Sequence, residues 1–211
     1  RSLQSDYGST LVNKGFALLC LEMPCFGGHQ FPDESSRSKA GLWRGKPLFG
    51  QMISELLAGI EFLNQNPLVD SNRIGTLGIS MGGTHAWWLA SLDERISASV
   101  NMCCFADLNL LIQTGQHDGH GQYMTVPGLL TQFSTGQIAG LTAPRPQLVC
   151  VGLQDWSTPA KCFSLSRDEL MKCYKKACVS NNIEFFVDKN AGHEETAQMR
   201  EKIMTFLKEK L

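Results

Sequence analysis

Apolar residues follow a helical spacing in one part of the chain and form short continuous runs elsewhere. Between Phe49 and Leu63 they recur every three or four residues, which predicts an amphipathic helix that ends before Pro67. Short apolar runs bounded by turn residues are instead typical of buried strands. Such runs occupy residues 16–21, 73–79, 96–102, 147–151 and 183–187.

Further helices are predicted between these strands, over residues 82–92, 164–180 and 194–211. Residues 30–47 are polar and contain Pro, Ser and Gly, so we expect an irregular surface connection there. Residues 105–140 lack a clean periodicity, and we interpret them as a lid-like insertion. Alternating strands and helices predict an α/β fold in one domain, residues 1–211, with a mostly parallel sheet and helices on both faces.

The stretch Gly78-Ile-Ser80-Met-Gly82 fits the pattern G-x-S-x-G and lies between a predicted strand and a predicted helix. In that context the serine occupies a sharp, strained turn and acts as a nucleophile. We expect Gly78 and Gly82 to leave room for this turn. The N–H of Met81 would start the helix and could stabilise an oxyanion.

A serine hydroxyl needs a base at neutral pH, and His193, in the loop after the last predicted strand, is our candidate. Asp155 follows strand 147–151 and would orient the imidazole. Asp107, a few residues after strand 96–102, is the competing acid. The chain order Ser80, Asp155, His193 favours Asp155, because it is the order that the G-x-S-x-G fold uses.

Four other side chains are expected near the substrate, since their segments follow strands or belong to the insertion. They are Phe26, His120, Tyr123 and Trp156. The hydrolysis expected from Ser80, His193 and Asp155 needs neither a metal nor an organic cofactor. We predict no metal site, because no pair of cysteines has zinc-binding spacing.

Charge and composition indicate which classes of binding partner are not expected. Lys and Arg number 19 against 20 Asp and Glu, so neither nucleic acid nor an anionic membrane is expected as a partner. No apolar run is long enough to span a bilayer. The eight cysteines look like reduced thiols and residues 1–10 are polar, which together predict a cytoplasmic protein.

These motifs together resemble the α/β-hydrolase superfamily, in particular its dienelactone-hydrolase and acetyl-xylan-esterase-like branch. The resemblance runs through Lys14-Gly-Phe-Ala17, Asp70-Ser-Asn-Arg-Ile-Gly75, the Ser80 turn, Leu141-Thr-Ala-Pro-Arg-Pro146, Gly152-Leu-Gln-Asp155 and Gly192-His-Glu194. It implies hydrolysis of a small-molecule ester, with small acyl or acetyl groups favoured. Peptidase or thioesterase activity on the same fold is the alternative.

Two departures from this branch qualify the prediction. Dienelactone hydrolases proper carry Cys at the position of Ser80, so the serine favours ordinary esters. The first strands of the family, and the loop that supplies its second oxyanion donor, have no counterpart in the sequence. A non-catalytic binding module is therefore the rival reading, and an open sheet edge would favour a homo-oligomer.

Overall fold

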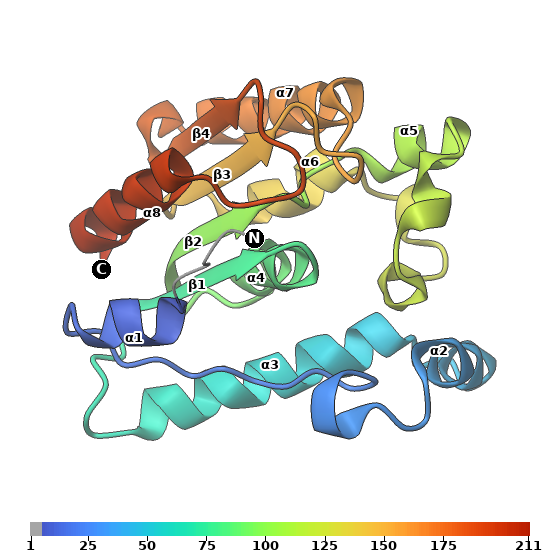
Figure 1. The fold of residues 1–211 in the computed structure, drawn as a ribbon, viewed down its shortest axis with the longest axis horizontal. Coiled ribbons are helices and arrows are strands. Elements are labelled where there is room, and N and C mark those ends of the chain that lie inside the picture. Colours follow the sequence, from blue (N-terminus) through green and yellow to red (C-terminus); the bar gives the residue numbers. More distant parts are fainter. Residues whose placement is uncertain (1–5) are drawn as a thin grey trace.

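The computed structural model describes residues 6–211. A parallel four-stranded sheet in the order β1-β2-β3-β4 forms its centre (Figure 1). The strands are β1 (Ile74–Ile79), β2 (Ile96–Met102), β3 (Gln147–Gly152) and β4 (Ile183–Asp188). The helices are α1 (Tyr7–Val12), α2 (Glu34–Trp43), α3 (Leu48–Gln65), α4 (Met81–Leu92), α5 (Leu108–Gln113), α6 (Thr135–Ala139), α7 (Ala160–Lys176) and α8 (Ala197–Lys210).

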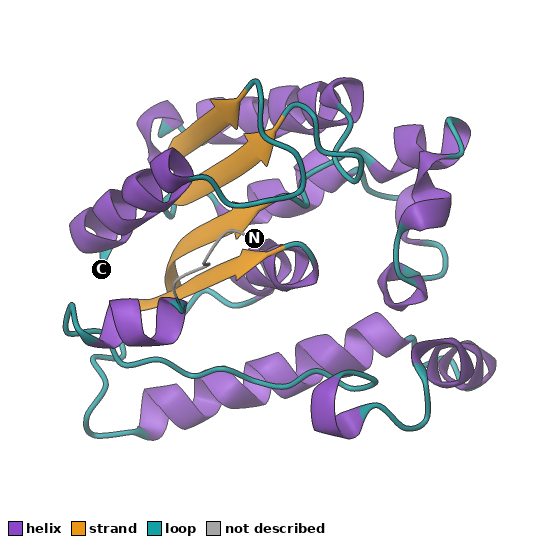
Figure 2. Ribbon diagram, viewed as in Figure 1, coloured by secondary structure: helices purple, strands orange, loops and turns teal. Residues whose placement is uncertain are grey.

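Helices cover both faces of this sheet, as Figure 2 shows by colour. Alternate residues of β3 face opposite sides, because side chains in a strand alternate with a period of two. Leu148 and Cys150 pack with α1 and α8, whereas Val149 and Val151 pack with α4, α6 and α7. The α/β prediction is confirmed, and the central strands β2 and β3 are buried on both sides, as is typical of a parallel sheet.

Apolar spacing correctly predicted α3, which packs through Ile60 against Ile74 of β1 and against Leu89 of α4. The strands after residue 70 and the three predicted helices between and after them also form, with ends shifted by a few residues. All four strands point toward the side of the molecule where α5 lies (Figure 1). Loops that follow the strands therefore gather at that edge.

The prediction of a strand over residues 16–21 is wrong. This segment is extended but has no strand partner among the described residues, and it runs beside α3 (Figure 1). Leu19 and Leu21 lie against the helix instead, since a Cβ added to Gly59 would lie 2.6 Å from Leu21 and 3.3 Å from Leu19. Leu18, by contrast, is 41% exposed. An apolar run indicates burial, but a strand also needs a neighbour to bond with.

The irregular connection predicted over residues 30–47 is also wrong, because it contains α2. The sequence of α2 has no apolar periodicity that would predict a helix. The helix is marked by a polar cap at its start, where Asp33 accepts a hydrogen bond from the N–H of Ser36 at 2.7 Å. The predicted insertion at 105–140 consists of α5, α6 and the 3₁₀ turns Gln116–Gly119, Gln122–Met124 and Leu129–Thr131 between them. In the described part of the chain, no helix combines the length and apolarity that crossing a bilayer requires.

Candidate active site

The turn between β1 and α4 holds Ser80 in a left-handed backbone conformation, with φ at +56°. Few residues other than glycine adopt such a φ, so the turn is strained, as the G-x-S-x-G pattern predicts. The Ser80 N–H donates to the carbonyl of Met102 in β2 at 2.9 Å. This bond ties the serine to the neighbouring strand and leaves its side chain at the carboxyl edge of the sheet.

Close backbone contacts explain one glycine of the motif. A Cβ on Gly78 would lie 2.1 Å from the carbonyl oxygen of Gly82, which a side chain cannot do. The same role predicted for Gly82 is wrong, because a Cβ there would meet no atom within 4 Å. Gly83 is the second crowded position, since its Cβ would lie 2.7 Å from the carbonyl of Met102 and 2.8 Å from the sulfur of Cys104.

The loops after β3 and β4 touch through their backbones. A Cβ on Gly152 would lie 2.3 Å from the carbonyl oxygen of Ala191, so glycine allows the two loops to cross there. The N–H of Gln154 donates to the same Ala191 carbonyl at 2.9 Å. Asp155 follows on the first loop and His193 on the second, so this contact brings acid and base side by side.

Ser80, His193 and Asp155 form one chain of hydrogen bonds. The Nε2 atom of His193 lies 2.8 Å from the Ser80 hydroxyl, and Nδ1 lies 3.0 Å from each carboxylate oxygen of Asp155. The Asp155 side chain is fully buried, whereas about a quarter (26%) of the His193 side chain is exposed. This arrangement can pass a proton from the serine to the imidazole while the carboxylate stabilises the resulting charge.

Electrostatics support the same arrangement. Burial alone would raise the pKa of Asp155, but hydrogen bonds from His193 and Ser157 outweigh burial and hold that pKa below its ordinary value. The hydrogen bond to Asp155 raises the pKa of His193 by more than partial burial lowers it. Asp155 is therefore ionised near neutral pH, and His193 is a stronger base than an isolated imidazole.

Asp107 has a different task. Its carboxylate accepts a hydrogen bond from the N–H of Leu110 at 2.8 Å and caps the start of α5. Asp155 is therefore the acid that is hydrogen-bonded to His193.

Two of the four residues expected near the substrate lie beside the base. The Trp156 ring centroid is 5.7 Å from that of His193, and the His120 ring centroid is likewise 5.7 Å from that of Trp156. Trp156 is 57% exposed. Its indole therefore presents a free apolar surface directly next to the imidazole.

The other two lie in an apolar cluster between α3 and the 105–140 segment. Tyr123 is 6% exposed, and its ring centroid lies 6.2 Å from that of Phe49 in a tilted arrangement, so its role is packing. Phe26 is partly buried and packs against the same cluster, as does the side chain of Met81. The backbone N–H of Met81 is the first of α4 and has no acceptor within the helix, as a helix start requires.

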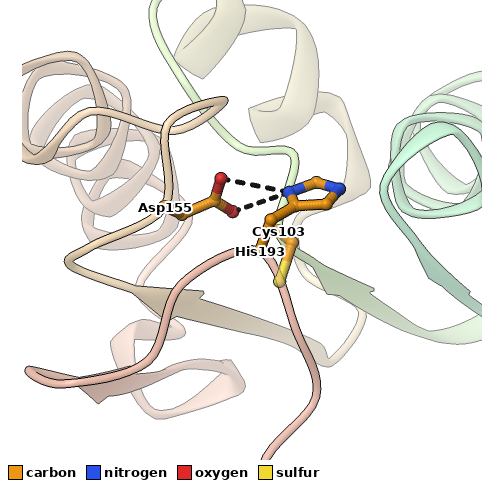
Figure 3. A group of neighbouring side chains, drawn as sticks. All are labelled: Cys103, Asp155 and His193. Atoms are coloured by element: carbon orange, nitrogen blue, oxygen red, sulfur yellow. Dashed lines mark hydrogen bonds and ion pairs between the residues drawn. The ribbon is translucent and has the colours of Figure 1, made fainter. Parts of the chain in front are cut away.

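Figure 3 shows Cys103 with Asp155 and His193, a group whose potential ligand atoms all lie within 4.8 Å of one another. A metal would need a thiolate and a free imidazole nitrogen. Burial and then Asp155 raise the pKa of Cys103 to about 12, so its thiol keeps its proton, which points to the Glu194 carbonyl at 3.5 Å. The Nδ1 of His193 is bonded to Asp155 (Figure 3). The group is thus arranged as a hydrogen-bonded network.

Sequence reasoning missed Ser157. This residue is 4% exposed, and its hydroxyl lies 2.8 Å from Asp155 and 2.9 Å from Nδ1 of His193. A serine two residues after an aspartate often folds back on that carboxylate, and this spacing is the signal that could have found it.

Known proteins match this chain at the level of sequence and of fold. "Putative hydrolase YtaP" of Bacillus subtilis (strain 168) is 36% identical over 202 residues, which are 96% of this chain and 67% of that protein. A structure described as a "putative acetyl xylan esterase" from Bacteroides fragilis has a TM-score of 0.68 at 16% identity and covers 94% of this chain and 55% of its own. A glucuronoyl esterase from Caldicellulosiruptor kristjansonii has a TM-score of 0.61 at 17% identity, covering 78% and 50%.

This chain therefore spans about half the length of the solved structures that it resembles. The model of the dienelactone hydrolase family matches residues 3–201, which is nearly the whole chain. The resemblance inferred from the motifs is confirmed: the chain belongs to the dienelactone hydrolase family and has an α/β-hydrolase fold.

Proposed function

We propose that the chain is a serine esterase that cleaves small carboxylic esters through a covalent acyl-enzyme, with Ser80 as nucleophile, His193 as base and Asp155 as orienting acid. The observation that carries this proposal is the unbroken series of hydrogen bonds from Ser80 through His193 to Asp155. A structural role for any one of the three would not require all three to be joined in this order.

In the first half of the reaction, the Ser80 oxygen attacks the ester carbonyl as Nε2 of His193 takes its proton. Negative charge then develops on the carbonyl oxygen, and the N–H of Met81 at the start of α4 would donate to it. The imidazolium is stabilised by the Asp155 carboxylate and returns the proton to the departing alkoxide. The alcohol leaves, and the acyl group stays on Ser80.

In the second half, a water molecule replaces the alcohol. His193 takes a proton from this water, whose oxygen attacks the acyl carbonyl, and the same Met81 N–H stabilises the second tetrahedral intermediate. Collapse breaks the bond to Ser80, which recovers its proton from His193. The carboxylic acid is released with the protein unchanged, and no step needs a cofactor.

Several features favour a small acyl group. Phe26 and the Met81 side chain pack against an apolar cluster next to the Ser80 turn. A long acyl chain would have to displace these packed side chains, so short acyl groups are favoured there. The exposed indole of Trp156 beside His193 would contact the alcohol part of the ester. Ser80, in the place where dienelactone hydrolases proper use Cys, supports ordinary esters. All eight cysteines are free, which supports action in a reducing compartment such as the cytoplasm.

Hydrolysis of p-nitrophenyl esters tests this proposal. We expect the acetate and butyrate to be cleaved faster than long acyl esters, thioesters or a peptide anilide. Ser80→Ala should lower kcat by at least roughly 1000-fold. Ser54→Ala, which removes an exposed hydroxyl on α3, is the matched control and should keep the wild-type rate. A Ser80→Ala protein with full activity would refute the proposal, and thioester or peptide cleavage alone would replace it with the alternative activity.

A further inference from the structure

Ser157 lies at the centre of the acid and base loops, between β3 and α7. Its backbone N–H donates to the Oδ1 atom of Asp155 at 2.8 Å, and its hydroxyl lies 2.8 Å from the same oxygen. The hydroxyl also lies 2.9 Å from Nδ1 of His193 and 3.4 Å from the carbonyl oxygen of Cys103. One side chain thus touches both the proposed acid and the proposed base.

The protons in this network can be assigned from its donors and acceptors. An ionised carboxylate can only accept hydrogen bonds, whereas a hydroxyl donates one and accepts up to two. If Nε2 of His193 is to accept the Ser80 proton, Nδ1 must carry the other ring proton. The Ser157 hydroxyl then donates to Asp155 and accepts a share of the Nδ1–H, and each polar atom of the network has a partner.

Asp155 then accepts hydrogen bonds from three donors: the N–H and the hydroxyl of Ser157, and Nδ1 of His193. With its side chain fully buried, the carboxylate has no water to supply such bonds. Two fixed donors on Oδ1 also stop the carboxylate from turning away from the imidazole. Second partners of this kind fix the orientation of histidines in many functional sites.

We propose that Ser157 is a positioning residue of this site: its hydroxyl holds the Asp155 carboxylate and the His193 ring in the single orientation that aims Nε2 at Ser80. The inference rests on the proposed function, because it assigns Ser157 a part in the same proton transfer. Ser157 does not touch the reacting atoms and acts only through its two partners.

Ser157→Ala tests the inference, because it removes the hydroxyl and keeps the backbone N–H. We expect kcat for p-nitrophenyl acetate to fall about 10-fold with KM unchanged, the loss of one hydrogen bond to a charged group. The Nδ1–H proton signal of His193 should also shift in the NMR spectrum. Ser166→Ala is the matched control, since Ser166 on α7 is fully buried and its hydroxyl has no partner within the described residues. It should change neither readout.

The NMR signal separates this inference from the proposed function. If wild-type protein cleaves no ester, the proposed function fails, yet the His193 signal still reports whether Ser157 holds the ring. An unchanged signal in Ser157→Ala would overturn the inference, whatever happens to the rate. A fall in kcat equal to that of Ser166→Ala would also overturn it, because the effect would then come from any buried hydroxyl.

Discussion

Two neighbouring strands end in the same unusual way, with different consequences. Ser80, directly after β1, has φ at +56°, and Cys103, directly after β2, has φ at +55°. The N–H of each residue donates to the next strand, Ser80 to Met102 and Cys103 to Cys150. Both residue types are nucleophiles in other enzymes. Two potential nucleophiles thus follow neighbouring strands with a similar positive φ, although Ser80 leads directly into α4 and Cys103 into a loop.

Their surroundings differ. The Ser80 hydroxyl is partly accessible and faces Nε2 of His193. The Cys103 thiol is 1% exposed, beneath the acid and base loops, and its raised pKa keeps it protonated. A strained turn at a strand end therefore does not make a nucleophile by itself. A hydrogen bond to Nε2 of His193 and open access separate Ser80 from Cys103, although the Cys103 sulfur also lies within 4.8 Å of that imidazole.

The largest expected effect comes from a substitution that impairs the base His193, not from one in the Ser80 turn. Asp155→Asn should lower kcat about 10,000-fold, because an amide cannot stabilise the imidazolium and favours the wrong ring tautomer. Asp107→Asn is the matched control and should stay close to wild type, since asparagine also caps helices well. Steady-state kinetics of both variants decide between the two acids. A large loss for Asp107→Asn alone would reverse the assignment.

A pair of glycine variants tests the turn. Gly78→Ala should destabilise the protein by about 3 kcal/mol or more, because its Cβ would meet the backbone of Gly82. Gly82→Ala should instead be neutral or stabilise by up to about 1 kcal/mol, since that position is open and alanine favours the helix. Urea unfolding measures both free energies. Equal losses for the two variants would contradict the geometry described for the turn.

The pH dependence of kcat/KM reports the base. His193 must be neutral to accept the Ser80 proton, and its pKa lies above the ordinary value of about 6.5 because of Asp155. Activity should therefore fall up to about 10-fold per unit as the pH drops below a midpoint higher than 6.5. In Asp155→Asn the residual activity should have its midpoint at lower pH. A midpoint that stays in place would mean that another group controls the rate.

The smallest effect is expected from the second strand end. Cys103→Ala removes a protonated thiol that bonds to the Glu194 carbonyl and does not contact the reacting atoms, so kcat should stay within about threefold of wild type. Stability should fall by about 1 kcal/mol, the cost of a small cavity and one weak hydrogen bond. Kinetics and urea unfolding check both values. A loss of kcat as large as that of Asp155→Asn would show that the two strand ends are not distinct in the way proposed.

Patterns in the sequence predicted the part of the fold where burial and periodicity agree. The strands at Ile74, Ile96, Gln147 and Ile183 and the helix over α3 all formed. The segment at Phe16 failed because pairing depends on a neighbour that an apolar run cannot reveal. The helix α2 was missed because its signal is the cap at Asp33 and not an apolar face.

At the site, sequence order suggested three side chains that the structure joins by hydrogen bonds, because loops after parallel strands converge at one edge. It could not reveal that Gly152 lets those loops cross, since that depends on a contact with Ala191 far along the chain. The spacing of Asp155 and Ser157 signals their local contact, but the contact of Ser157 with His193 exists only after β4 lies next to β3. Among the residues expected near the substrate, Trp156 has an exposed ring whereas Tyr123 is buried packing. The sequence does not reveal this difference in burial.

The most direct test of the central claim is to find which side chain a fluorophosphonate labels. This reagent reacts with a serine whose hydroxyl is activated by a base, and mass spectrometry of peptides locates the adduct. We predict one adduct on Ser80, absent from Ser80→Ala and strongly reduced in His193→Ala. Wild-type protein that gains no adduct at Ser80, or Ser80→Ala protein labelled as fully as wild type, would contradict the account.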